Sequence, residues 1–141
     1  MGRLADPYAV LEQKLLKRIR SACSLHVQEL KEVKDKNKEQ QKIKEAALIE
    51  KHIDPSDTVI LMDKDGRHFS SSEDFAGFLK PISQPAFVIG SDVGLHASLK
   101  SRADQTVSFS RLTFPHQLFR IMLYEQIYRA QCIWSNHPYH K

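Results

Sequence analysis

The amino-acid sequence predicts a single α/β domain, spanning residues 1–141, around a mainly parallel β-sheet. Three short apolar runs are typical of buried strands, and each is followed by a segment with helical features. Such alternation of strand and helix is typical of a parallel sheet with helices on its faces. The chain has 141 residues, of which 41% are hydrophobic, and this size fits one compact domain.

The strands are expected at three apolar runs, residues 58–62, 86–89 and 106–109. A turn is expected at 63–66, with Gly66 free to adopt a positive φ. Parallel α/β sheets bind ligands beyond the carboxyl ends of their strands. These ends fall at Met62, Gly90 and 109–114, so the sequence predicts a ligand site along this edge of the sheet.

Helices are expected before and between the strands. An opening amphipathic helix is predicted by apolar residues three to four apart: Tyr8, Leu11, Leu15 and Ile19. The polar stretch 31–42 is typical of a loop or a solvated helix entry, and 43–53 predict a second helix. Serines at 70–72 are suited to cap a short helix that Pro81 closes. A weak alternation at 25–27 suggests a short strand, and 97–103 another helix.

The last long helix is expected to begin at Pro115, a residue that suits a first helical position. Its apolar residues cover more than one side: Leu118, Ile121, Met122, Ile127, Ala130, Ile133 and Trp134. Such a helix buries a second side, either in the core or against another chain. The segment 135–141 is too polar, and too interrupted by Pro138, to continue it.

Several classes of protein are excluded or disfavoured. No apolar run approaches the ~18 residues of a membrane span, and no signal-peptide core is present, so we expect a cytoplasmic protein. The glycines form neither a GxGxxG nor a P-loop motif. Cys23 and Cys132 form no CxxC pair, and we expect two buried thiols. Asp63 and Asp65 could form an acid pair, although turn formation explains both residues.

The carboxyl-terminal part of the chain is basic and ends in a polar tail. Residues 111–141 carry a net charge of +3, from Arg111, Arg120, Arg129 and Lys141 against Glu125. A basic end favours a polyanion such as RNA. The tail adds His137, Tyr139 and His140, which have groups suited to bases and phosphates, although a frayed terminus explains it equally well. Pro138 disfavours a metal site at the two histidines, and no metal is expected.

Four motifs in order resemble the RlmH family (ribosomal large subunit methyltransferase H), small members of the SPOUT superfamily. The motifs are FVIGSDVGL (87–95), VSFSRLTFPHQL (107–118), EQIYRA (125–130) and HPYHK (137–141). The resemblance implies a C-terminal trefoil knot and a homodimer. It also implies methylation of N3 of a pseudouridine in 23S rRNA, using S-adenosylmethionine bound in the knot.

Carried over by position, the cofactor contacts would be Met62, Gly90, Phe109, Ser110, Arg111, Leu112, Thr113 and Phe114. Attack by N3 requires loss of its proton, and His137 or His140 is a candidate base. Tyr139 is suited to stack on or orient the base. Phosphate contacts are expected at Arg111, Arg120, Arg129 and Lys141.

The sequence departs from the family pattern in two places. Ser91 stands where the family has a second glycine, and we expect a usable cofactor loop with less backbone freedom. The first strand of the family is expected to be missing or truncated, since the chain starts at the turn that follows it. These departures favour the alternative function, a non-catalytic dimer that binds RNA or the ribosome and retains the fold.

Overall fold

The computed structural model describes residues 6–31 and 33–141. The chain is divided into two compact units, between which it passes several times. Among the described residues, one unit comprises 29–31, 33–68 and 83–113, and we call it the sheet unit. The other comprises 6–28, 69–82 and 114–141, and we call it the helical unit. That residues 1–141 form a single domain therefore stays a prediction.

The sheet unit contains three parallel strands in the order β2-β1-β3. They are β1 (Thr58–His68), β2 (Pro85–Ile89) and β3 (Gln105–Ser108). The parallel α/β sheet is thus confirmed, with all three strands where the apolar runs place them. The knot stays a prediction.

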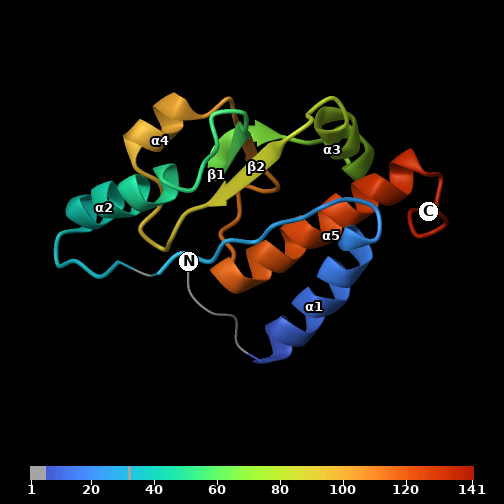
Figure 1. Ribbon diagram of the computed structural model, residues 1–141, viewed down its shortest axis with the longest axis horizontal. Helices are drawn as coiled ribbons and strands as arrows, with labels where there is room; N and C mark the ends of the chain where they lie inside the picture. Colours follow the sequence, from blue (N-terminus) through green and yellow to red (C-terminus); the bar gives the residue numbers. More distant parts are fainter. Residues whose placement is uncertain (1–5, 32) are drawn as a thin grey trace. The chain divides into compact units, whose positions relative to one another are not determined.

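Two helices of this unit cover one face of the sheet, as Figure 1 shows: α2 (Lys38–Glu50) and α4 (Ala97–Arg102). The core of this face contains Ala46, Ile49, Val59, Leu61, Val88 and Leu99. Helix α2 begins within the polar stretch because the Asn37 side chain accepts hydrogen bonds from the amides of Glu39 and Gln40. The strand suggested at 25–27 does not form.

The turn predicted at 63–66 is wrong, because these residues continue β1 as a bulge. Met62 and Arg67 both pair with Val107 of β3, so the four residues between them are extra in the ladder. Gly66 does not adopt a positive φ. A Cβ there would lie 2.6 Å from backbone atoms of Thr106 and Val107, so glycine is needed for close approach of two backbones.

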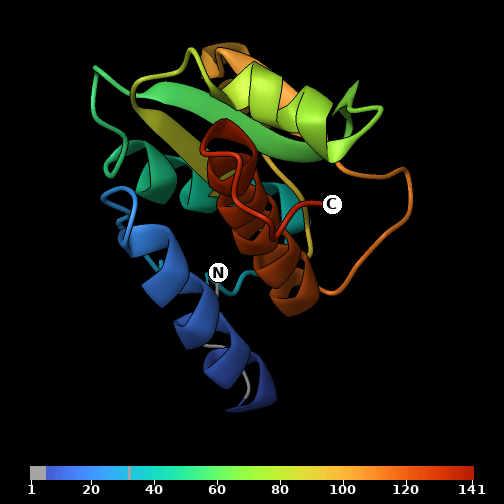
Figure 2. The ribbon, with the colours of Figure 1, turned by 90° about the vertical axis from the view of Figure 1, so that its right-hand side faces the viewer.

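The helical unit consists of α1 (Asp6–Arg20), α3 (Ser72–Leu79) and α5 (His116–Trp134). Helix α1 runs beside α5 in both ribbon views (Figures 1 and 2), and α3 packs on α5 as well. The expected serine cap of α3 is confirmed, since Ser71 Oγ accepts from the Asp74 amide at 3.2 Å. Pro115 is the N-cap of α5, one position before the first helical residue.

The apolar surface of α5 is largely explained within this unit. Helices α1 and α3 both pack against it, and its buried residues are Ile121, Leu123, Tyr124, Ile127, Ala130 and Cys132. The second apolar side therefore does not by itself require another chain. The expectation of two buried thiols is wrong for Cys23, which is exposed, whereas Cys132 is buried.

No helix in the described part of the chain is long and apolar enough to cross a membrane.

Candidate functional site

The register of the sheet brings the predicted strand ends to one edge. Met62 of β1 lies opposite Ile89 of β2 and opposite Val107 of β3. Gly90 and Phe109 follow within two residues of these partners, so both leave the sheet beside Met62. Three candidate cofactor positions that are far apart in sequence are thus neighbours along the carboxyl edge, where parallel sheets bind ligands.

The loop after β2 is a tight turn that depends on two glycines. The amide of Gly94 donates to the carbonyl of Ser91 at 3.0 Å, and Gly94 has a φ of 81° that favours glycine. Gly90 is buried, and a Cβ on it would lie 2.8 Å from two side-chain atoms of Leu95. Gly90 therefore lets the loop close over the end of β2.

A buried carboxylate on α2 holds this loop. Glu45 is only 3% exposed; its Oε2 accepts from Ser91 Oγ at 2.6 Å and its Oε1 from Gln41 Nε2 at 2.9 Å. Sequence reasoning missed Glu45 because it followed apolar residues alone. The available signal was the spacing of four that places Gln41 and Glu45 on the same side of α2 as Ile49.

The segment after β3 supplies the remaining candidate cofactor positions. Ser108 Oγ contacts both the amide and the carbonyl of Ser110, and Ser110 Oγ accepts from the Leu112 amide at 3.0 Å. The Leu112 side chain is 71% exposed. The segment therefore presents an exposed apolar side chain next to backbone of irregular conformation. Phe114 belongs to the helical unit.

Arg111 lines an open depression beside this segment. Its volume is about 420 Å³, and its lining is Lys64, Asp65, Gly66, His68 and Arg111. The bulge in β1 supplies three of these five residues, and His68 follows it in the same strand. Two fixed cations against one carboxylate leave it positive overall, which suits an anionic group.

The alternative of an acid pair is not supported by the partners of Asp63. Lys100 Nζ lies 2.6 Å from Asp63 Oδ2, and the Asp65 amide donates to Asp63 Oδ1 at 3.1 Å. Burial raises the pKa of Asp63, but these two hydrogen bonds outweigh it, so the pKa is lowered from 3.8. Asp63 is therefore an ionised partner of α4.

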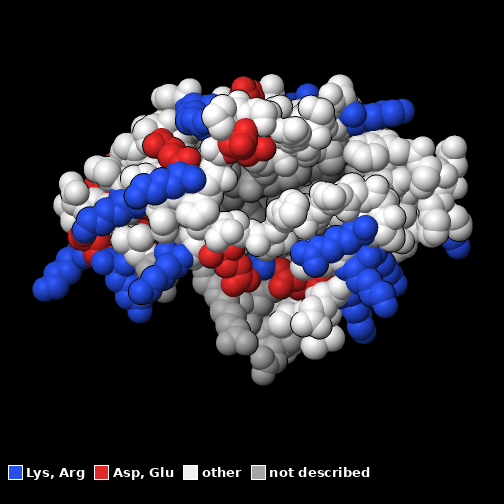
Figure 3. Space-filling model, viewed as in Figure 1, with Lys and Arg blue, Asp and Glu red and all other residues white. Residues whose placement is uncertain are grey.

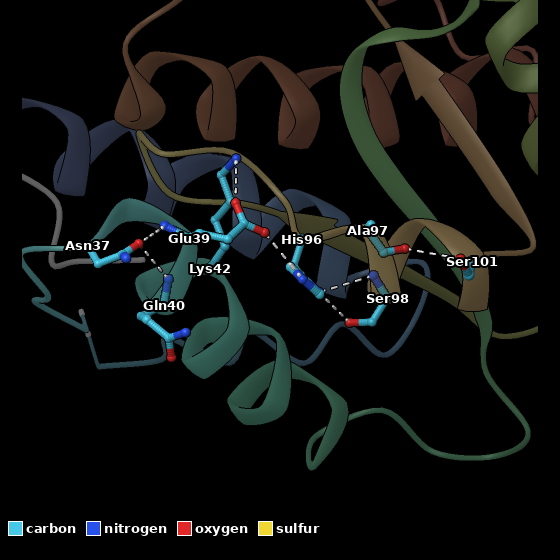
Figure 4. Close-up of polar contacts among 8 residues, drawn as sticks. All are labelled: Asn37, Glu39, Gln40, Lys42, His96, Ala97, Ser98 and Ser101. Atoms are coloured by element: carbon cyan, nitrogen blue, oxygen red, sulfur yellow. Dashed lines mark hydrogen bonds and ion pairs between the residues drawn. The ribbon is translucent and has the colours of Figure 1, made fainter.

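Helix α4, which follows the loop, is tied to α2 by His96. Its Nδ1 accepts from the Ser98 amide at 3.1 Å and caps α4, while Nε2 lies 3.4 Å from Glu39 Oε1 (Figure 4). Because Nδ1 must be unprotonated to accept this bond, Nε2 carries the proton toward Glu39. Both ends of the 91–95 loop are thus anchored, one through Glu45 and the other through His96.

The C-terminal tail is folded onto the helical unit. Tyr139 is half-buried; its hydroxyl donates to Glu125 Oε1 at 3.0 Å, and its ring packs on Tyr128, with centroids 4.8 Å apart. The Arg129 guanidinium carbon lies 4.9 Å from the same ring centroid. The view of the tail as a frayed end is therefore wrong, because Tyr139 has partners inside the chain.

His140 links the tail to α3. Its Nε2 lies 2.9 Å from Glu73 Oε1, and Arg129 Nη1 lies 3.3 Å from its Nδ1. Hydrogen bonds from Ser71, the Glu73 backbone and His140 lower the pKa of Glu73 to about 2. His137 is exposed, and its Nδ1 accepts from the Tyr139 amide at 3.2 Å.

Two of the four residues expected to contact phosphates are already paired with carboxylates of the chain. Arg120 is ion-paired with Glu12 of α1, and its Nε donates to Tyr124 Oη at 3.0 Å. Burial raises the pKa of Tyr124 to about 12, so it remains a neutral acceptor. Arg129 pairs with Glu125 at 2.6 Å.

Arg111 and Lys141 are exposed. The candidate cofactor residues up to Thr113 lie in the sheet unit, and the tail residues His137, Tyr139 and His140 lie in the helical unit. Among the described residues, no three His, Cys, Asp or Glu side chains are grouped to hold a metal ion.

Residues 1–140 match the profile of a family described as "Predicted SPOUT methyltransferase". The chain belongs to this SPOUT methyltransferase family. It is 43% identical over 136 residues to a Clostridium botulinum (strain Langeland) protein named "Ribosomal RNA large subunit methyltransferase H". That match covers 89% of this chain and 85% of the relative. A Clostridium tetani protein of the same name is 38% identical over 153 residues, covering all of this chain and 96% of the relative.

Membership in this methyltransferase family confirms the resemblance drawn from the four motifs.

Proposed function

We propose that this chain transfers a methyl group from S-adenosylmethionine to N3 of a pseudouridine in 23S rRNA. The observation that carries this proposal is the register of the sheet, which gathers Met62, Gly90 and Phe109 at one edge. Membership in the family supports methyl transfer, and the name of the relatives supports rRNA as the substrate. Assembled ribosomes are the expected form of the substrate, and a cytoplasmic location goes with it.

The residues at the carboxyl edge fit the cofactor. The backbone of 109–113 would hold it, with the exposed Leu112 side chain against its apolar part and the closed 91–95 loop beside it. The cofactor supplies a methyl group already activated on a sulfonium. The protein's part is to hold this group in line with the acceptor nitrogen and to exclude water.

The tail is proposed to handle the RNA base and its proton. Methyl transfer from the bound cofactor would leave the electron pair of the carbon–sulfur bond on sulfur, so the N3 proton is what the protein has to accept. The N3 proton goes to His140 Nδ1, whose contact with Arg129 at 3.3 Å is the weakest that this ring makes. Arg129 retains Glu125 as its partner when that contact is given up. Tyr139 and His137 orient the base.

One pair of measurements separates this function from the non-catalytic alternative. Calorimetry with S-adenosylmethionine tests the cofactor site, and transfer of labelled methyl to 70S ribosomes tests the reaction. We expect saturable binding and incorporation of about one methyl per ribosome. RNA binding without cofactor binding would instead establish the alternative, an RNA-binding protein that retains the fold.

The homodimer is proposed from the family resemblance. Sedimentation at micromolar concentration is expected to show a species of twice the 16.2 kDa chain mass. A species of the chain mass alone would contradict it.

A further inference from the structure

The helical unit carries a second set of cations that the expected phosphate contacts do not include. Arg120 and Arg129 are expected to meet phosphates, yet both guanidinium groups are already ion-paired with carboxylates of the same unit. Helix α1 has four basic residues in its last two turns: Lys14, Lys17, Arg18 and Arg20. We call these four residues the α1 basic face. Within the described part of the chain, none of the four forms an ion pair.

The packing of α1 fixes which side the cations occupy. Leu15 and Ile19 are 5% and 0% exposed and form its buried stripe. Lys14, Lys17 and Arg20 lie on other sides of the helix, and Arg18 reaches toward Tyr128 of α5; all four residues are exposed. Figure 3 shows blue side chains gathered over the carboxyl-terminal half of α1.

The carboxylate of Glu12, on the same helix, does not neutralise this face. Glu12 is ion-paired with Arg120 of α5, and its side chain is only 13% exposed. The carboxyl end of a helix carries about half a negative charge, which favours basic residues in the last turn. The helix dipole therefore explains why basic residues are favourable here, but half a negative charge does not neutralise four cations.

Two of the four cations are held in place before any ligand arrives. The Arg18 guanidinium carbon lies 5.6 Å from the centroid of the Tyr128 ring. The Nε of Arg20 donates to the carbonyl of Leu25 at 3.3 Å, so its terminal nitrogens stay available. Pre-ordering of this kind reduces the entropy lost on binding. A face that served only solubility would gain nothing from it.

We propose that the α1 basic face binds the phosphodiester backbone of the RNA substrate. This inference rests on the proposed function only in taking RNA as the partner. The four residues span six helical positions, which is about 9 Å along the axis, so the face meets neighbouring phosphates of one strand. Such contacts position the RNA without reading its sequence.

The test compares two triple variants with the same loss of charge. The first combines Lys14→Ala, Lys17→Ala and Arg20→Ala. Arg18 is left in place because it packs on Tyr128. The control combines Lys36→Ala, Lys51→Ala and Lys80→Ala, three exposed residues scattered over the two units. A third variant, Lys14→Arg with Lys17→Arg, keeps the charge.

Binding to protein-free 23S rRNA is measured by filter retention at several salt concentrations. Each lost phosphate contact reduces the slope of log K against log salt by about 0.7 to 0.9. We therefore expect the α1 triple variant to lose about two to three units of slope and about 10- to 100-fold in affinity at low salt. The scattered control and the arginine variant are expected to bind nearly as the unmodified protein does.

Equal losses in the two triple variants would overturn the proposal, since net charge alone would then explain binding. Unchanged binding by the α1 variant would also overturn it, and so would preferential binding of the face to anionic vesicles over RNA. Calorimetry with S-adenosylmethionine runs in parallel. If the unmodified protein binds the cofactor and methylates ribosomes, and the α1 variant binds RNA equally well, this inference alone is wrong. If the unmodified protein neither binds the cofactor nor methylates ribosomes, the proposed function is wrong.

Discussion

The Ser91 hydroxyl donates a hydrogen bond of 2.6 Å to the buried carboxylate of Glu45. The two residues are 46 positions apart. The contact connects helix α2 to the loop that leaves β2 at the candidate cofactor edge. Ser91 therefore has a role that the glycine of the family pattern could not fill, because its hydroxyl donates to a buried carboxylate oxygen of Glu45.

The first prediction concerns this pair. Ser91→Gly is expected to lower the free energy of unfolding by about 1–3 kcal/mol, because it leaves Glu45 Oε2 buried without its partner. Glu45→Ala should cost a similar amount by leaving Gln41 and Ser91 unpaired. Urea denaturation of both single variants and the double variant forms a cycle. Additive losses would show that the two side chains do not interact.

The second prediction concerns Gly90. Gly90→Val is expected to abolish S-adenosylmethionine binding, because the loop must move to accommodate the new side chain. Since a Cβ meets Leu95 at 2.8 Å, the variant should also lower the melting temperature. Adding Leu95→Ala removes the clash and should restore part of the affinity. Calorimetry and thermal melts measure the two effects separately, and unchanged affinity would remove Gly90 from the site.

The third prediction concerns the tail. Deletion of 137–141 is expected to leave cofactor binding nearly unchanged and to remove most methyl transfer to ribosomes. It should also destabilise the protein, because the Tyr139 ring packs on Tyr128. Point variants separate the two effects, since His140→Ala keeps this ring in place. Normal methylation by the truncated protein would show that the tail residues take no part in the reaction.

The fourth prediction concerns pH. The folded pKa of Glu73 is about 2, below its ordinary 4.5, so ionised Glu73 favours the folded state. Its contribution is fully present above pH ~4.5 and is lost as the pH falls toward 2. Glu73→Gln should therefore flatten the acid side of the stability curve. Urea midpoints between pH 2 and 6 measure it; identical curves for both proteins would rule out the contribution.

Local sequence patterns suffice to place the strands of the sheet. The three apolar runs at 58–62, 86–89 and 106–109 predict the three strands because a strand buried on both faces has no polar positions. The carboxyl ends of β2 and β3 follow from these runs, whereas β1 continues past Met62 to His68. The four motifs predict the family, which the match over residues 1–140 confirms.

Other features depend on distant partners. The 63–66 segment has the residues of a turn, yet it continues β1, because Gly66 lets its backbone approach Thr106 and Val107. The polar tail has the composition of a free end, yet Tyr139 and His140 find partners on α5 and α3.

The sequence alone determined where the three strands begin, where β2 and β3 end, and the family, since these depend on local hydrophobic pattern and on motifs. The tertiary structure decided which polar groups are paired. Glu45 is buried against Ser91, and Arg120 is engaged by Glu12, whereas Lys14 and Lys17 remain exposed. Whether a charged side chain is paired depends on its distance from groups that folding brings close. That distance cannot be read from residue type and spacing along the chain.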